Sequence, residues 1–264
     1  TYGLDLVQTF TCGQCFRWND DGSGAYVGVA SGRAARVYAA DGAARIECAD
    51  GDLDFWRVYL DMDTDYAAAR ESVMIGDYLT ECAEYGAGIR ILRQDKWEAL
   101  CSFIISQCNN IPRIKGIVEK LCALFGEAFN TPWGVRYSFP SASRVALLEE
   151  PELAPLRAGY RAAYIIGAAR AVASGEVDLE YAASLCGNEA RKYLKGLNGV
   201  GDKVANCAVL FGLHRMDAFP IDVWVKKALR ENMPRDFDPQ SLGEYAGLAQ
   251  QYMFFRERER DKIG

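Results

Sequence analysis

Long hydrophobic runs are missing from the 264-residue sequence, and that absence narrows the class of protein first. No run of about 18 apolar residues occurs, so we expect no membrane-spanning helix. The N-terminal segment TYGLDLVQTF has no basic stretch followed by an apolar one, so we expect no signal peptide. Internal repeats and low-complexity linkers are also missing. These absences predict a globular cytoplasmic protein, and the lack of a targeting segment points to a prokaryotic source.

The cysteines lack the arrangement of a disulfide framework or a metal site. There are nine of them, an odd number at irregular spacing, which fits a reducing compartment. Cys12 and Cys15 have the spacing of a zinc or redox pair, but no second such pair occurs and the context is strand-like. A chain of this length buries roughly 75% of its unfolded surface, so it needs no metal or disulfide to fold.

An excess of positive charge is missing too, because the formal net charge is −6 at pH 7. Taken alone, this argues mildly against a nucleic-acid partner. Binding depends on local charge, however, and residues 191–230 contain eight Lys or Arg against three Asp. The charge pattern therefore leaves a nucleic-acid partner open.

What is present divides into a strand-rich start and a helical remainder. Residues 1–60 contain short segments, several alternating apolar and polar, separated by DGSG, SG and DG turn signals: CFRWND, AYVGVA, RAARVYAA and ARIECAD. They predict a meandering antiparallel sheet. The fold class is α+β, with a β-rich domain over residues 1–90 and a mainly helical domain over residues 91–264. The helical domain could divide into two subdomains with a cleft between them.

The helical prediction starts at about Asp65, where apolar residues begin to recur at three- and four-residue spacings. The expected helices lie in DKWEALCSFIISQC, IPRIKGIVEKLCALFG, SASRVALLEE, YRAAYIIGAARAVASG, GNEARKYLKGL, GDKVANCAVLFGL, IDVWVKKALREN and YAGLAQQYMFFRERER. Many of them end near glycine, as helices commonly do.

One stretch, residues 194–225, carries most of the chemistry. A helix ends near Gly196, the chain turns through Gly199, Val200 and Gly201, and a new helix opens at Asp202. The glycines let the backbone turn sharply and approach a partner, and the free N–H groups of the new helix form a seat for phosphate. This is the pattern of a helix-hairpin-helix that grips a DNA strand by its backbone. An ordinary glycine-rich connection between helices explains the turn alone equally well.

Two side chains in this stretch favour catalysis when they are taken together. Lys203 lies in the first turn of the new helix, where the helix dipole and partial burial both disfavour the ammonium form. Some neutral amine, which is a nucleophile, is then available. Asp222 follows a proline and precedes VWVKKAL, so it is placed to cap a helix. Singly, a solvated lysine and a simple cap are the commoner explanations.

The segments LNGVGDKVANC and FPIDVWV resemble the hairpin and Gly/Pro–Asp signature of base-excision DNA glycosylases. Further segments are similar to the 8-oxoguanine DNA glycosylase branch, in the same order along most of the chain: GQCFRW, SQCNNIPRIKGIVEKLC, AGYRAAYI and YAGLAQQYMFF. The resemblance implies a nucleoid-associated, bifunctional glycosylase and AP lyase that excises 8-oxoguanine from duplex DNA, preferably opposite cytosine. It assigns to Lys203 the attack on C1′ with formation of a Schiff base, and to Asp222 the stabilisation of the cationic sugar.

The resemblance also implies a pocket for the extruded base. The damaged base would enter between Cys207 and Phe254, and Gln250 would bond its Watson–Crick edge. The carbonyl of Gly13 would accept a hydrogen bond from N7–H, which 8-oxoguanine has and guanine lacks. Without the resemblance, these positions read as two core residues, a surface amide and a turn.

A second implied group of residues would contact the strand opposite the lesion. Arg113 and Arg161 match arginines that read the orphaned cytosine, and Tyr160 matches a wedge pushed into the gap. The family usually has three asparagines where this chain has Cys108, Asn109 and Asn110. A thiol cannot replace the hydrogen bonds of an amide, so Cys108 puts the efficiency of strand opening in doubt.

The resemblance implies no required cofactor, and we expect a monomer. Backbone carbonyls of Lys195, Leu197 and Val200 would hold one cation at the hairpin. The related endonuclease III branch carries an iron–sulfur loop after the hairpin, but no cysteine follows Cys207 here, so no cluster is expected. Trp224 stands where animal members have a histidine, and His214, the only histidine, is interpreted as structural. A glycosylase for another damaged base and a non-catalytic DNA-binding protein remain as alternatives.

Overall fold

The N-terminal region is an antiparallel sheet in the computed structural model, which describes residues 3–263. Its four strands, β1 (Trp18–Asp20), β2 (Tyr26–Ala30), β3 (Arg33–Ala40) and β4 (Ala43–Cys48), pair in sequence order. Each strand falls within one of the four segments expected from alternation and turn signals, except that β4 begins one residue before its segment. The meander is therefore confirmed.

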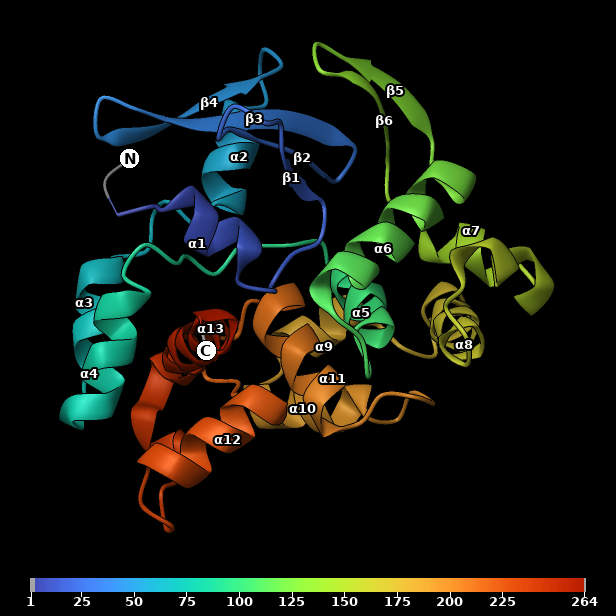
Figure 1. Ribbon diagram of the computed structural model, residues 1–264. Coiled ribbons are helices and arrows are strands. Elements are labelled where there is room, and N and C mark those ends of the chain that lie inside the picture. Colours follow the sequence, from blue (N-terminus) through green and yellow to red (C-terminus); the bar gives the residue numbers. More distant parts are fainter. Residues whose placement is uncertain (1–2, 264) are drawn as a thin grey trace.

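Two helices pack with this sheet, and neither was predicted from the alternation pattern. Helix α1 (Leu6–Thr11) is capped by the Asp5 carboxylate, which accepts from the Gln8 amide at 2.8 Å. Helix α2 (Leu53–Tyr59) lies against one face of the sheet (Figure 1). The core between them is aromatic: the Phe10 and Trp18 rings stack at 4.2 Å, and the indole N–H of Trp18 donates to the Tyr59 hydroxyl at 3.0 Å. Both helices are only one or two turns long, too short for a helical period to be recognised.

The rest of the chain is mainly helical, as expected. The following elements occur in order: α3 (Tyr66–Val73), α4 (Gly76–Tyr85), α5 (Lys96–Ile105), α6 (Ile111–Phe125), α7 (Ala142–Ala146), the 3₁₀ helix η1 (Glu150–Leu156), α8 (Arg161–Ala173), α9 (Leu179–Ser184), α10 (Gly187–Leu194), α11 (Asp202–Cys207), the π-helix η2 (Ala208–Gly212), α12 (Val223–Asn232), the 3₁₀ helix η3 (Pro239–Tyr245) and α13 (Ala246–Ile263). No helix in the described part of the chain is long and apolar enough to cross a membrane.

A hairpin inside the helical region was not anticipated from the sequence. Strands β5 (Ala128–Thr131) and β6 (Gly134–Tyr137) pair around a short turn, and Gly134, the first residue of β6, has φ of +96°. The hairpin projects away from the helices in Figure 1, and its strands have no fully buried residue. A hairpin with little buried surface lacks the apolar alternation by which strands are predicted.

Helix α5 lies at the centre of the larger core. Its side chains from Ala99 to Ile105 are all buried, and the helix packs against α6, α8, α11 and η2. Helices α3 and α4 pack against α13, so the end of the chain is joined to the region that follows the sheet (Figure 1).

The packing of α5 against α11 brings Ser106, at the C-terminal end of α5, close to Lys203, at the beginning of α11.

Candidate active site

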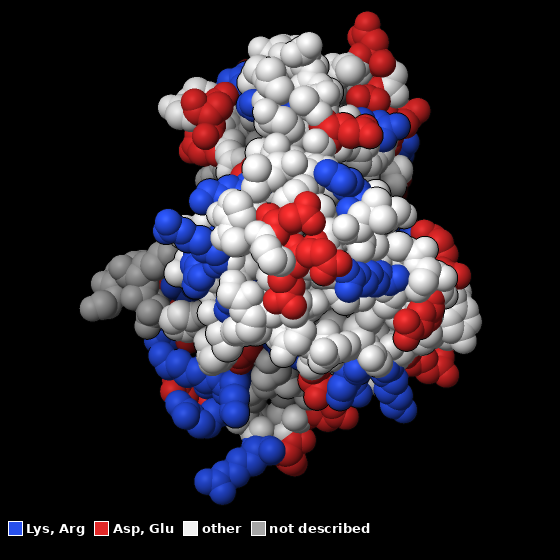
Figure 2. All heavy atoms as spheres, turned by 90° about the vertical axis from the view of Figure 1, so that its right-hand side faces the viewer, with Lys and Arg blue, Asp and Glu red and all other residues white. Residues whose placement is uncertain are grey.

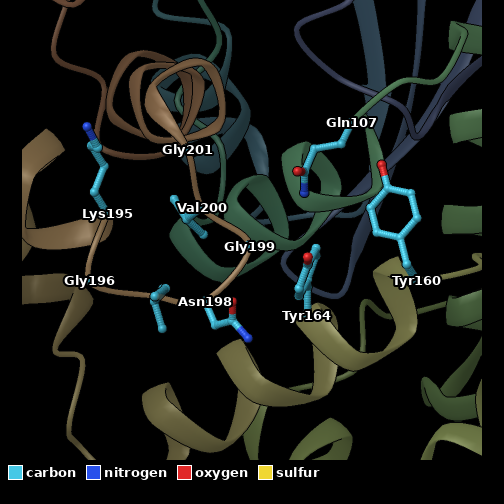
Figure 3. Close-up of a pocket in the computed structure, with 10 residues that line it drawn as sticks. Gln107, Tyr160, Tyr164, Lys195, Gly196, Asn198, Gly199, Val200 and Gly201 are labelled. Carbon is cyan, nitrogen blue, oxygen red and sulfur yellow. The ribbon is translucent and has the colours of Figure 1, made fainter.

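The turn between α10 and α11 has the backbone geometry of a hairpin. Lys195 ends α10, and the Val200 amide donates to the Leu197 carbonyl at 3.1 Å. Gly199 has φ of +82°, and a β-carbon placed there would lie 2.3 Å from the Tyr164 ring. The turn and the side chains of Gln107, Tyr160 and Tyr164 line an open depression of about 600 Å³, with the turn on one side and the side chains on the other (Figure 3).

The charge at the hairpin is partly neutralised by the protein itself. The Asp202 carboxylate accepts from the Arg191 guanidinium at 2.6 Å and from the Lys195 ammonium at 2.8 Å. These contacts, chiefly the hydrogen bond from Lys195, lower the pKa of Asp202. Lys and Arg side chains gather at the lower end of the molecule in Figure 2, the end at which Figure 1 shows α12. The hairpin thus places the exposed residues Gly201 and Asp202 next to basic side chains.

Lys203 lies in the first turn of α11, and its half-buried side chain turns toward α5. Its amine donates to the Ser106 hydroxyl at 3.0 Å and lies 5.3 Å from the centre of the Phe103 ring. The amine also interacts with the Cys207 thiol one helical turn further along. The structure therefore places the amine inside the fold, in contact with α5, and not on a solvated helix face.

Asp222 is the N-cap of α12, as expected from the sequence. Its Oδ1 accepts from the amides of Trp224 at 3.0 Å and Val225 at 2.9 Å. Burial raises the pKa of Asp222, although the capping bonds and the positive charge of Lys203 both oppose the shift. Burial likewise raises the pKa of the Cys207 thiol. The amine, the carboxylate and a neutral thiol thus lie close enough to interact electrostatically.

Two of the residues expected to hold a base, Gly13 and Phe254, lie side by side, although they are far apart in sequence. Gly13 has φ of +82°, and a β-carbon placed there would lie 3.2 Å from Ile111 and 3.3 Å from the Phe254 ring. Any larger residue at this position would fill the space beside Phe254. Cys207 is 3% exposed, and Phe254 is half-buried on α13. Gly13 and Phe254 are therefore neighbours across the junction between the N-terminal region and the last helix.

Gln250 is 4% exposed, so it is not the surface amide that its type alone suggested. Its side-chain oxygen is buried and has no hydrogen-bond partner among the described residues. Leaving a buried acceptor unpaired costs about 1–3 kcal/mol, which a bound group with an N–H donor would recover. The adjacent Gln251 donates to the Cys12 carbonyl at 2.6 Å and so joins α13 to the segment that contains Gly13.

Both arginines expected to read the opposite base are bound to backbone carbonyls. Arg161 is 4% exposed, and its guanidinium donates to the carbonyls of Gln107, Cys108 and Ala158. Arg113 is exposed and donates to the Arg157 carbonyl at 3.1 Å. Arg161 therefore fastens the segment after α5 in this state and is not a solvated helix residue.

Cys108 lies at the tip of the segment that Arg161 holds. It is exposed and has φ of +44°, a backbone conformation that asparagine tolerates better than cysteine. Its thiol lies beside the hydroxyl of Tyr160, whose side chain is 53% exposed. Asn110 caps α6 by accepting from the Arg113 amide at 3.0 Å, and the Asn109 side chain bonds the Ile105 carbonyl at 3.2 Å. Cys108 is thus exposed at the tip of the loop, and Asn109 and Asn110 shape the loop.

Several residues at the site were not singled out from the sequence. Ser106, Phe103 and Gln251 all make contacts described above, and Ser106 and Gln251 lie inside the quoted segments SQCNN and YAGLAQQYMFF. No pattern identified them, because a lone serine or phenylalanine on a buried helix looks like core. His214 lies 3.4 Å from the buried Asp61 carboxylate, in agreement with a structural role.

Cys12 and Cys15 do not form a pair. They are free thiols buried in different cores, Cys12 with the helical body and Cys15 under the sheet. Burial raises the pKa of both thiols. Among the residues that the structure describes, no group of three or more His, Cys, Asp or Glu could hold a metal ion.

Comparison with known proteins extends over both halves of the chain. Residues 1–100 match the N-terminal domain of 8-oxoguanine DNA glycosylase, and residues 101–236 match the HhH-GPD superfamily of base excision DNA repair proteins. The chain is 30% identical to the N-glycosylase/DNA lyase of Arabidopsis thaliana over 98% of its own length and 79% of the plant protein. It is 40% identical to the N-glycosylase/DNA lyase of Saccharomyces cerevisiae, over 55% of this chain and 42% of the yeast protein.

A solved structure agrees over nearly the whole chain. The Clostridium acetobutylicum 8-oxoguanine glycosylase/lyase, in complex with dsDNA containing cytosine opposite to 8-oxoG, is 33% identical with a TM-score of 0.91. The match covers 99% of this chain and 94% of the Clostridium chain.

Proposed function

The chain belongs to the 8-oxoguanine DNA glycosylase branch of the HhH-GPD superfamily, and on this basis we propose that it excises 8-oxoguanine from duplex DNA as a glycosylase and lyase. The observation that supports the proposal is that the Lys203 amine, directly after the hairpin, turns toward α5 and interacts with the buried Asp222 carboxylate. A protein that only binds DNA has no need of a sheltered amine beside a buried carboxylate.

In the proposed reaction, Lys203 is the nucleophile. Its neutral amine bonds to C1′ of the damaged nucleoside while the bond from C1′ to the base breaks and its electron pair leaves with the base. Asp222 stabilises the positive charge that develops on the sugar, and burial strengthens this interaction. The attached amine then passes a proton to O4′ of the sugar, the bond between C1′ and O4′ breaks, and a Schiff base between the lysine nitrogen and C1′ results. Removal of the C2′ proton then expels the 3′ phosphate and cuts the strand.

We assign recognition of the base to the groups around Gly13 and Gln250. The unpaired oxygen of Gln250 would accept from an N–H on the Watson–Crick edge of the base. Phe254 and Cys207 would enclose the faces of the base, and the Gly13 carbonyl would accept from N7–H. One such bond discriminates by about 1–3 kcal/mol, so it contributes to the choice of 8-oxoguanine over guanine without accounting for all of it.

We assign the opposite strand to Arg113, Arg161 and Tyr160. The two guanidinium groups would exchange their backbone carbonyl contacts for the acceptors of the orphaned cytosine, and the exposed Tyr160 ring would enter the gap. Cleavage of duplexes with 8-oxoguanine opposite each of the four bases tests this assignment. We expect the fastest reaction opposite cytosine. Equal rates opposite all four bases would contradict the assignment of Arg113 and Arg161 to the opposite base.

Gly199, Val200, Gly201 and Asp202 are proposed to contact the DNA backbone, with the amides of Gly199, Gly201 and Asp202 as donors to phosphate, because the Val200 amide donates to Leu197. A cation bound by the carbonyls of Lys195, Leu197 and Val200 would support that contact. The Leu197 carbonyl accepts one bond from the Val200 amide and keeps a second lone pair for such an ion. Action as a monomer stays a prediction.

Borohydride trapping tests the central proposal. Borohydride reduces the Schiff base, so wild-type protein should form a covalent adduct with a duplex that contains 8-oxoguanine. Lys203→Gln should form none, while Lys120→Gln, which removes an exposed lysine on α6, should trap normally. The absence of an adduct with folded wild-type protein, or an undiminished adduct with Lys203→Gln, would show that this lysine is not the nucleophile.

A further inference from the structure

The contacts of the Lys203 amine extend beyond the residues assigned to the reaction above. Its two partners on α5 are Ser106, whose hydroxyl lies 3.0 Å from the amine nitrogen, and Phe103, whose ring centre lies 5.3 Å away. Neither side chain is titratable. The titratable groups that face the amine are Cys207 on the same helix and Asp222 at the start of α12.

The hydrogen-bond direction between Ser106 and Lys203 follows from a second contact. Ser106 is the C-cap of α5, is 9% exposed, and donates its hydroxyl proton to the Phe103 carbonyl at 2.7 Å. A serine hydroxyl has one proton, so its oxygen can only accept from the lysine. The lysine nitrogen is therefore held as a donor, and its charged form makes the stronger bond.

The Phe103 ring acts in the same direction. An ammonium group within about 6 Å of an aromatic ring centre is attracted to the ring face. This ring is fixed by Phe211 of η2, stacked at 5.2 Å, and by the edge of Phe16 at 5.8 Å. The ring and the hydroxyl together form a rigid cradle that favours the ammonium form. The helix dipole of α11 acts in the opposite direction, because it disfavours a positive charge in the first turn.

The segment after Ser106 is fastened as well. Arg161 donates to the carbonyls of Gln107 and Cys108, the two residues that directly follow Ser106. The hydroxyl that holds the lysine is thus anchored on one side by its own helix and on the other by a buried arginine. Its position is set by the protein before any DNA arrives.

We propose that Ser106 is a positioning residue, which, with the ring of Phe103, holds the Lys203 amine protonated and in a fixed place until the damaged nucleoside enters. This inference rests on the proposed function, because it concerns the state of the same amine before attack. On entry of the nucleoside, the ammonium passes one proton to water, and the neutral amine leaves the Ser106 hydroxyl and turns to C1′.

The pH dependence of kcat/KM for base release tests the cradle, because this quantity reports the ionisation of the free enzyme. Ser106→Ala removes the acceptor and favours the neutral amine, so the acid limb should move to lower pH by about one unit. The plateau should fall by about tenfold because the amine is no longer held in place. Ser106→Thr keeps the hydroxyl and should keep the wild-type limb.

Ser102→Ala is the matched control, since it removes a buried hydroxyl one turn earlier on α5 that has no contact with the lysine. Its limb should coincide with that of the wild type. An unshifted limb in Ser106→Ala, or an equal shift in Ser106→Thr, would overturn the proposal. If a Ser106 variant fails to fold, Phe103→Leu removes the ring face and should shift the limb in the same direction, and an unshifted limb there has the same consequence.

The two proposals can fail separately. Wild-type protein that forms no borohydride adduct contradicts the function itself. If wild-type protein traps normally, but the acid limb of kcat/KM is unchanged in the Ser106 and Phe103 variants, only the cradle is contradicted.

Discussion

The two glycines of the hairpin look equivalent in the sequence, but the structure predicts different consequences for their replacement by alanine. Gly199 has φ of +82°, and its added β-carbon would lie 2.3 to 2.7 Å from three ring atoms of Tyr164. Gly201 has φ of −85°, and nothing lies within 4 Å of its added β-carbon. Gly199→Ala should therefore destabilise the fold, and Gly201→Ala should not.

The size of the effect follows from two contributions. A left-handed backbone costs a non-glycine residue about 1–2 kcal/mol. Forcing a methyl group into occupied space costs about 1–3 kcal/mol, because the ring or the turn must move. The sum is about 2–5 kcal/mol, which for a protein of this size lowers Tm by roughly 5–15 °C.

Thermal unfolding followed by circular dichroism measures the loss, with Gly201→Ala as the control within the same turn. Removing the ring should remove the overpacking, so Gly199→Ala should cost about 1–3 kcal/mol less in a Tyr164→Ala background. An equal cost with and without the ring would refute the steric argument. Gly201→Ala should instead weaken binding to duplex DNA at unchanged Tm, because its methyl group stands where the phosphate backbone would approach.

Two further predictions concern the carboxylates of the site. Asp222→Asn keeps a good helix cap but removes the charge, so we expect base release to fall by about 10²- to 10³-fold at an equal or higher Tm. Because burial raises the pKa of Asp222, the folded protein binds this proton more tightly than the unfolded chain, and stability should fall as pH rises above the ordinary value of 3.8. The variant should lack that decline in a Tm series across pH, and a series identical to that of the wild type would contradict the assigned cause. Asp202→Asn releases Arg191 and Lys195 for phosphate, so fluorescence anisotropy should show tighter duplex binding at low salt and a log–log salt slope steeper by about one, whereas unchanged binding would mean that the two cations do not meet DNA.

The sequence predicted those features that repeat locally or that chemistry restricts to a few residue types. Alternation and turn signals located the four strands of the sheet, and the apolar spacing located α5, α6, α8 and α10 to within a few residues. The combination of a glycine turn, an early lysine and an aspartate two residues after a proline indicated the candidate site, and the roles of these residues stay predictions. The β5–β6 hairpin and helices α1 and α2 escaped because short, marginally buried elements carry too little periodic signal.

The environments of the functional side chains depended on contacts between distant segments. Gln250 is a surface amide by residue type and a buried acceptor in the structure, because α13 passes between the N-terminal segment and the helical body. Arg161 and Arg113 are solvated cations by residue type; in the fold Arg161 is buried, Arg113 stays exposed, and both donate to backbone carbonyls.

The sequence by itself determined which groups are available for the reaction, namely one lysine at a helix start, one aspartate at a helix cap and a turn that contains two glycines. Only the tertiary structure decided which side chains contact the lysine amine. Ser106 and Phe103 precede Lys203 by about a hundred residues, and they reach its amine through the packing of α5 against α11. Burial and hydrogen-bond direction arise from such packing, and they have no counterpart in local sequence pattern.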